Sequence, residues 1–175
     1  VLAFAMTGPM QILLPKLAKE VLGLSELQRG AYLGMMALTL IMGGVAALLL
    51  GKHLHHGIAI FAGTTVASLL FASLSHWTNA AASAAALGCM GVLGGMVISL
   101  VVAGIQGQAP PALRGRVMGI YSIISQVIPA ASGVMAGAVV RSAGITQAIF
   151  VAGFGLASMA VLAAVLMPQL RKTRS

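Results

Sequence analysis

Long apolar stretches, separated by short polar or charged segments, make up nearly the whole chain. An α-helix rises about 1.5 Å per residue, so about 20 apolar residues cross the roughly 30 Å hydrocarbon layer of a membrane. The spacing of the charged and polar clusters predicts six such spans, at residues 1–15, 30–51, 58–74, 80–103, 110–140 and 145–167. We therefore expect an all-α membrane protein with six transmembrane helices.

The connections follow from the same pattern. The first span is short and carries Pro9 and Pro15, so we expect it to be kinked and to lack its beginning. Charged residues mark the loop that follows: Lys16, Lys19, Glu20, Glu26 and Arg29. The uncharged stretch between Lys52 and Arg114 is too long for one helix. It is expected to divide at residues 75–79, where Trp77 suits a membrane–water interface.

Composition supports a membrane protein. Hydrophobic residues are 59% of the chain and charged residues only 7%, whereas an ordinary soluble domain has roughly 25% charged residues. A net charge of +8 would suggest nucleic-acid binding in a soluble protein. Here the basic residues flank apolar spans, so they indicate orientation in a lipid bilayer, and no nucleic-acid partner is expected.

The basic residues are divided unequally between the two sides. With six spans, one side holds Lys52, Arg114, Arg116, Arg171, Lys172 and Arg174. The other side holds Lys16, Lys19, Arg29 and Arg141, together with both acidic residues. Cytoplasmic loops carry the excess of Lys and Arg, so we expect the C-terminus, the histidine-containing loop and the Arg114 loop to be cytoplasmic.

A short motif occurs twice. Arg29-Gly30-x-x-x-Gly34 opens the second span, and Arg114-Gly115-x-x-x-Gly119 opens the fifth. Each would start the middle helix of a three-helix group, and the two groups would have opposite orientations. This favours two inverted three-helix repeats, an arrangement found in many transporters.

The fifth span carries the motif Arg114-Gly115-Arg116-Val117-Met118-Gly119, followed by small residues from Pro129 to Gly133 and at Gly137. This pattern resembles the eleventh helix of the major facilitator superfamily. Residues 13–15 and 21–23 and the glycines at 30, 34, 43 and 44 are similar to the seventh and eighth helices of its enterobactin-exporter-like branch. The chain departs from that branch at Ala112-Leu113, where an acid is common, and in the loop at residues 51–57, which lacks an aspartate.

The resemblance implies that residues 1–175 are the C-terminal six-helix domain of a twelve-helix transporter whose N-terminal half is missing. The chain starts at Val1 without a signal peptide, which also indicates the interior of a longer protein. The implied function is secondary active transport across the bacterial cytoplasmic membrane by alternating access, with efflux of a drug-like or siderophore-like small molecule.

The resemblance further implies that the first, second, fourth and fifth spans line the transport cavity, whereas the third and sixth lie outside. The candidate substrate-binding residues are Gln11, Met35, Thr39, Ser99, Ser122 and Gln126. Each also has a structural alternative, either a hydroxyl bonded to its own helix or a methionine packed on a neighbour. The polar stripe of the fifth span, which includes Ser122, Gln126 and Gly133, fits a pathway or tight helix packing equally well.

Two further groups of residues are assigned roles. Arg114 and Arg116 are expected at the cytoplasmic mouth as a gate. They would either pair with an acid of the other half or simply follow the preference for basic residues on that side. GxxxG spacing makes Gly91 with Gly95, and Gly133 with Gly137, candidates for helix packing.

Several chemistries are excluded. No span carries an acid near its centre, so proton coupling would need a carboxylate from the missing half. His53, His55 and His56 lack the spacing and companion ligands of a metal site, so neither a metal nor a cofactor is expected.

The residues of an intramembrane serine protease and of an aquaporin are missing, and no catalytic residue or enzyme activity is predicted. The remaining alternative to a transporter is a non-transporting membrane scaffold or a self-associating six-helix module.

Overall fold

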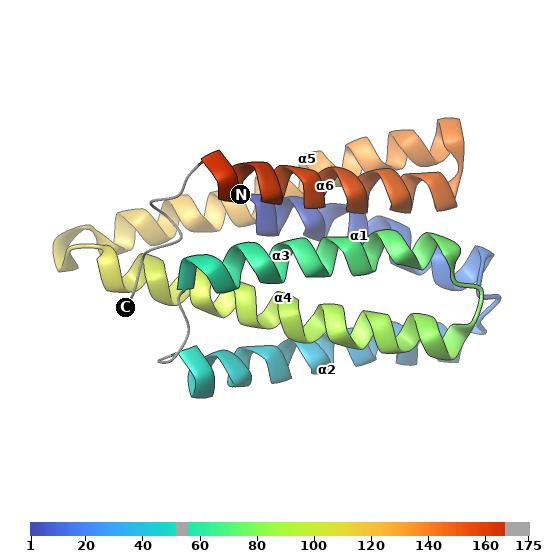
Figure 1. The fold of residues 1–175 in the computed structure, drawn as a ribbon, viewed down its shortest axis with the longest axis horizontal. Helices are drawn as coiled ribbons and strands as arrows, with labels where there is room; N and C mark the ends of the chain where they lie inside the picture. The colour runs from blue at the N-terminus through green and yellow to red at the C-terminus, as the bar shows by residue number, and fades with distance from the viewer. Residues whose placement is uncertain (52–55, 167–175) are drawn as a thin grey trace.

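The computed structural model describes residues 1–51 and 56–166. These residues form no strand, which confirms the all-α prediction. Their helices are α1 (Leu2–Glu20), α2 (Glu26–Leu50), α3 (His56–Ser73), α4 (Ala80–Gln108), α5 (Arg114–Ala143) and α6 (Ile145–Leu166), with the 3-10 helices η2 (Leu74–His76) and η3 (Pro111–Leu113) (Figure 1).

Five of the six long helices in the described residues have the length and apolar composition needed to cross a membrane. The helix α1 is not among them. It contains Pro9 and Pro15, and its last turns carry Lys16, Lys19 and Glu20. The expected division of the long uncharged stretch is confirmed, because η2 ends at His76 and the side chain of Asn79 caps α4 by accepting a bond from Ala81 N at 2.9 Å.

The predicted end of the first span was wrong. The helix continues through Lys16 to Glu20, and Glu26 and Arg29 belong to α2 rather than to a loop. Long charged side chains at a helix end reach water without unwinding the backbone, so they do not terminate the helix. The reversal comes instead at Gly23, whose φ of 60° is left-handed, and Leu24 N–H donates to Ala18 O at 3.0 Å.

Other helix ends are also displaced from their predicted positions. The helix α4 runs to Gln108 instead of residue 103, and α5 runs to Ala143, with Arg141 in its last turn. The helix α6 ends at Leu166 in the described residues, and Met167, the predicted end, lies outside them.

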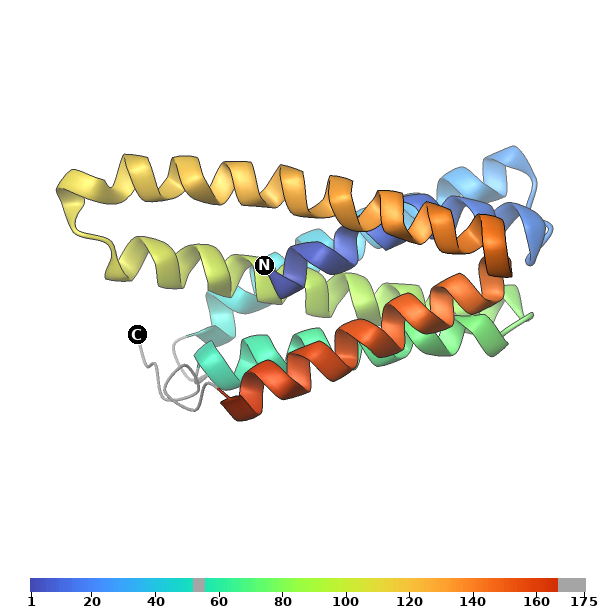
Figure 2. The same ribbon diagram turned by 90° about the horizontal axis from the view of Figure 1, so that it is seen from above.

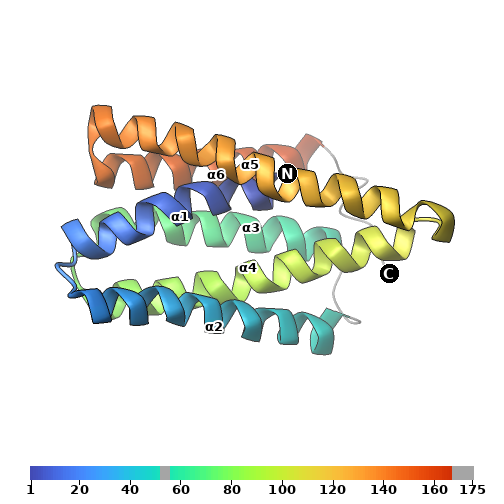
Figure 3. The ribbon, with the colours of Figure 1, turned by 180° about the vertical axis from the view of Figure 1, so that it is seen from behind.

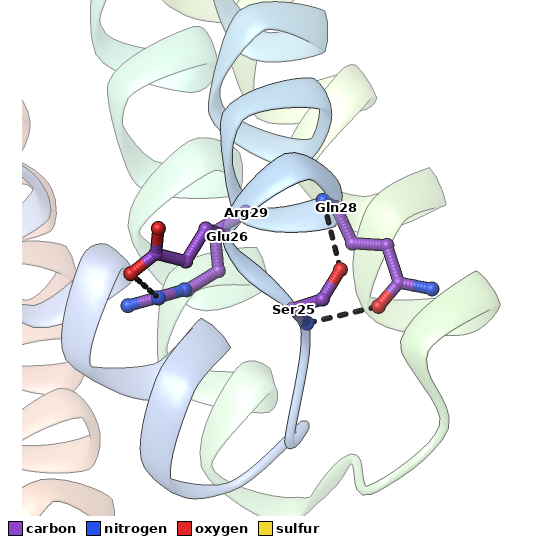
Figure 4. Close-up of polar contacts among 4 residues, drawn as sticks. All are labelled: Ser25, Glu26, Gln28 and Arg29. Carbon is purple, nitrogen blue, oxygen red and sulfur yellow. Dashed lines mark hydrogen bonds and ion pairs between the residues drawn. The ribbon is translucent and has the colours of Figure 1, made fainter.

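A capping box fixes the start of α2. Ser25 Oγ accepts the N–H of Gln28 at 3.4 Å, and Gln28 Oε1 accepts the N–H of Ser25 at 2.9 Å (Figure 4). One turn into the helix, Arg29 Nη2 lies 3.5 Å from Glu26 Oε1. These contacts satisfy N–H groups that would otherwise be free at the helix start, and they place α2 just five residues after α1.

The helices pack in three main pairs, α1 with α5, α2 with α4 and α3 with α6. The pairs α1–α5 and α2–α4 can be followed from the far side in Figure 3. The helix α1 also contacts α2, α3, α4 and α6, so it touches every other long helix and is central. In Figure 2, α3 and α6 lie together on one side of the bundle and α5 on the other.

Burial differs between the two ends of the bundle. The fully buried side chains include Leu13, Leu17, Phe71, Leu87 and Ile149, near the end where α1 turns into α2. By contrast, no residue from 101 to 128 is buried. The connection between α4 and α5 projects past the ends of α2, α3 and α6 (Figure 1). One end of the described bundle therefore has a packed core, and the other leaves α4 and α5 uncovered.

Glycines allow the paired helices to touch backbone to backbone. A Cβ at Gly43 would collide with Val92 O, and one at Gly95 would collide with Leu40 O, so α2 and α4 approach closely at both levels. In the other pair, a Cβ at Gly8 would collide with Pro129 O. In lipid, where apolar side chains gain little by leaving the solvent, this close packing holds helices together.

Replacing Gly95 by Ala should therefore separate α2 from α4. We expect Gly95→Ala to destabilise the protein by about 1–3 kcal/mol, since the backbone of Leu40 cannot rotate away as a flexible side chain would. Gly104→Ala on the same helix is the matched control, because a Cβ there meets nothing within 4 Å. Thermal unfolding in detergent measures both variants, and equal midpoints would refute the proposed role of Gly95.

Candidate functional site

The α1–α5 pair forms the first part of the site. The rings of Phe4 and Tyr121 meet edge to face, with centroids 5.4 Å apart. Further along, Gly8 faces Pro129, and the Cδ1 of Ile12 lies 3.0 Å from a Cβ built at Gly133. These contacts advance together along both helices, so α1 and α5 run parallel in a fixed register.

The contact between α1 and α5 is flanked by two surfaces, one toward α6 and one away from it, which we call rims. The two rims differ in polarity. On the rim toward α6, Pro9, Ser132 and Ala136 line an apolar groove. By helical spacing, Gln11 on α1 and Gln126 on α5 lie on the opposite rim, and both side chains are exposed. Two side-chain amides in the middle of these helices therefore face away from α6.

Ser122 lies one turn before Gln126 on the same rim. Gln126 Nε2 donates to the carbonyl oxygen of Ser122 at 3.3 Å and lies 3.5 Å from its Oγ. The glutamine is thus held back along its own helix, and its amide oxygen has no hydrogen-bond partner among the described residues. That oxygen can accept a hydrogen bond from a solute.

Three candidates lie at the α2–α4 pair. Thr39 Oγ1 is 3.0 Å from both Met35 O and Met36 O, so its hydroxyl is bonded to its own helix. The Cε of Met35 is 3.8 Å from a Cβ built at Gly88, and Ser99 Oγ is 3.3 Å from one built at Gly44. For Thr39 and Met35, these contacts match the structural alternatives of a self-bonded hydroxyl and a packed methionine.

The two helix pairs are organised alike. Met36, Leu40 and Met90 lie on the rim of the α2–α4 pair that borders α1 and α3, where they line a cavity. By helical spacing, Met35 and Thr39 lie on the other rim. Ser99 instead lines a space that it shares with Gly51 and with His56, the first residue of α3. Five of the six candidate residues therefore lie on rims that face away from α3 and α6, in two groups, one at each helix pair.

Two buried polar contacts between helices were not predicted. Tyr32 Oη and Ser83 Oγ are 2.7 Å apart and join α2 to α4, and Ser68 Oγ donates to Met6 Sδ at 3.5 Å and joins α3 to α1. Ser68 and Ser83 are fully buried. A serine in an apolar span bonds either its own helix backbone or a neighbouring helix. The sequence does not reveal which of the two it is, or the partner.

Charged groups in the described residues lie at the helix ends. Arg114 Nε donates to Ala109 O at 3.2 Å and so closes the turn between α4 and α5, while Arg116 is exposed. Neither arginine contacts a carboxylate in the described part of the chain. No cluster of His, Cys, Asp or Glu in these ranges could hold a metal ion, and His53 and His55 lie outside them.

The predicted packing glycines differ in their surroundings. Gly91 faces Thr39 and Gly95 faces Leu40, both on α2, and Gly133 lies against Gly8 and Ile12 on α1. A Cβ at Gly137 would meet nothing within 4 Å. The sequence reasoning missed Gly8 and Gly43, because neither begins a GxxxG pair and only the partner helix makes them necessary.

The sequence of this chain also matches a known protein family. The model of the Major Facilitator Superfamily matches residues 1–133, which span α1 to α4 and α5 as far as Gly133. The chain belongs to the Major Facilitator Superfamily. It is therefore a multi-pass membrane protein of a family of secondary transporters rather than enzymes. No curated protein and no solved structure matches the chain significantly.

The Tyr32–Ser83 contact allows a direct test of how this transporter holds α2 against α4. We expect Tyr32→Phe and Ser83→Ala to be coupled, with an interaction energy of about 0.6 kcal/mol and at most about 1.7 kcal/mol, the range of hydrogen bonds between membrane helices. A double-mutant cycle of unfolding free energies measures it. Strictly additive effects would mean that the hydroxyls do not interact in the folded protein.

Proposed function

We propose that this protein is a secondary transporter that moves a small molecule across the bacterial cytoplasmic membrane by alternating access. Residues 1–175 would form the C-terminal six-helix half of a twelve-helix transporter, with a cytoplasmic C-terminus. The transported molecule would be a drug-like or siderophore-like solute moved by efflux, as the resemblance to the enterobactin-exporter-like branch implies. Membership of the transporter family supports this proposal.

The packing pattern supports two inverted three-helix repeats. Two such repeats would make α1 equivalent to α4, α2 to α5 and α3 to α6. Under this equivalence, the α1–α5 contact corresponds to the α4–α2 contact, and the α3–α6 contact corresponds to itself. The repeated Arg-Gly motif fits the same exchange, because Arg29 lies in the first turn of α2 and Arg114 begins α5. Repeats of this kind place the solute site between them.

The observation that carries the proposed solute site is the exposure of Gln11 and Gln126 on apolar helices. A side-chain amide facing lipid would lose hydrogen bonds that it makes in water. We infer that this rim borders a water-filled path closed on its far side by the other half. Ser122 would share that path, and Met35, Thr39 and Ser99 would line its second part.

Coupling to protons would require a carboxylate within the membrane, and the described helices carry none near their centres. Glu20 ends α1, and Glu26 begins α2, where it pairs with Arg29. Neither is placed to carry a proton across a membrane. If transport is proton-coupled, the proposed N-terminal half would supply the titrating acid.

The solute site is tested by removing the amides. We expect Gln126→Leu and Gln11→Leu in the full-length protein to lower transport between twofold and about tenfold, the loss of one hydrogen bond of about 0.5–1.5 kcal/mol. Efflux of a panel of dyes and siderophores from expressing cells is the measurement. Gln147→Leu on the outer helix α6 is the matched control and should leave efflux unchanged.

The outcome also separates the two classes of function. Efflux that is absent for every solute in the wild type, although the protein reaches the membrane, would favour a scaffold or self-associating module. If all three variants lower transport equally, the proposed solute site is refuted, whereas the proposal that the protein is a transporter stands.

The proposed gate is tested at the α4–α5 turn. Arg114 is exposed apart from its bond to Ala109 O, so most of its guanidinium is free to pair with an acid of the other half. We expect Arg114→Gln to lower the transport rate severalfold and Arg114→Lys to retain most of it. Arg116→Gln should have no effect. Unchanged transport in Arg114→Gln would leave only the orienting role of the positive charge.

A further inference from the structure

A cavity of about 80 Å³ lies between α1, α2, α3 and α4, on the opposite rim of the α2–α4 pair from Thr39. Four methionines on three helices contribute to its wall: Met6, Met10, Met36 and Met90. Closely packed protein interiors leave few spaces larger than a water molecule, and this one is only partly enclosed by the four helices.

The wall of the cavity is apolar. Of its two hydroxyl-bearing residues, Thr7 donates to Ala3 O at 3.5 Å within its own helix, and Thr64 is buried. No charged residue lines the space. A water molecule needs two to four polar partners, so this cavity favours an uncharged apolar guest over water.

Methionine makes such a wall adaptable. Its unbranched side chain has three rotatable bonds and a polarisable sulfur that interacts favourably with aromatic rings. An engineered apolar cavity of about 150 Å³ binds benzene and xenon. The present cavity is smaller, so xenon would fit directly, whereas a benzene ring would require rearrangement of the methionine side chains.

Gly94 leaves one position of the wall without a side chain, although close packing does not require a glycine there. A Cβ at Gly94 would meet nothing within 4 Å, whereas one at Gly63 would lie 2.7 Å from Val97 Cγ2. Glycine inside a helix is less favourable than alanine. Gly63 permits the close approach of α3 to α4, but Gly94 only leaves the cavity larger.

We propose that this methionine-lined cavity is a binding site for a small uncharged apolar molecule, with an upper size near a single aromatic ring. The site is distinct from the rims that carry Gln11 and Gln126. Binding here does not depend on transport, so this proposal and the proposed function can fail separately.

The test uses the full-length protein in lipid nanodiscs with ¹³C-labelled methionine methyl groups. Xenon is added at increasing pressure, and benzene is added in a second series. We expect saturable chemical-shift changes at the methyl groups of Met6, Met10, Met36 and Met90. Met42 is 62% exposed and serves as the internal control, because xenon dissolved in lipid should shift its signal without saturation.

Variants with a filled cavity complete the test. Gly94→Val should abolish the saturable shifts, and Gly94→Ala, which fills less space, should weaken binding severalfold. Gly104→Val on the same helix should bind xenon as the wild type does, since a Cβ there also meets nothing within 4 Å. Gly94→Ala keeps the test valid if the larger side chain prevents folding.

Three results would overturn the proposal. The first is the lack of saturable shifts at the four cavity methionines. The second is saturable binding that persists in both Gly94 variants. Saturation confined to Met135 and Met159 would also overturn it, because these residues line the separate groove between α5 and α6.

Discussion

Backbone contact between paired helices determines the arrangement of this bundle. At Gly8 against Pro129, and at Gly43 and Gly95 against Val92 and Leu40, even a methyl group would collide with the partner's backbone. Apolar side chains gain little from leaving lipid for one another, so such close packing, with the few hydrogen bonds between helices, replaces the hydrophobic effect of a soluble core. The parallel pairs α1–α5 and α2–α4 follow from it.

Once two helices are fixed at their closest approach, each pair has two rims with different environments. One rim borders the outer helices α3 and α6 and is apolar, with the groove beside Pro9 and the cavity beside Met36. The other carries Gln11, Gln126 and Thr39. The two amides thus lie opposite the side where α3 and α6 complete the bundle, as the proposed half-transporter that meets a second half across a polar path would require.

The spans were predictable because membrane-crossing helices need long uncharged runs, and Arg29, Lys52 and Arg114 bound such runs in this sequence. Their ends were less predictable, since Lys19 and Glu20 reach water from the last turn of α1 and so do not end the helix earlier. The site could be predicted in part: helical spacing grouped Ser122 with Gln126, but it gave no reason to pair Tyr32 with Ser83. Such partners depend on the register between helices, which is set by contacts distant in sequence.

Register also explains why equal motifs have unequal surroundings. Gly91 and Gly133 each begin a GxxxG pair, yet Gly95 touches Leu40 whereas Gly137 faces open space. The α2–α4 pair stays close over several turns. In the α1–α5 pair, close backbone contact is confined to Gly8 against Pro129 and Gly133, and the first half of α5 has no buried residue. Close backbone contact is therefore more limited in the α1–α5 pair than in the α2–α4 pair, and α5 is held by fewer such contacts. In a transporter that changes conformation, the helix with fewer fixed contacts is the one that can move at the least cost in packing.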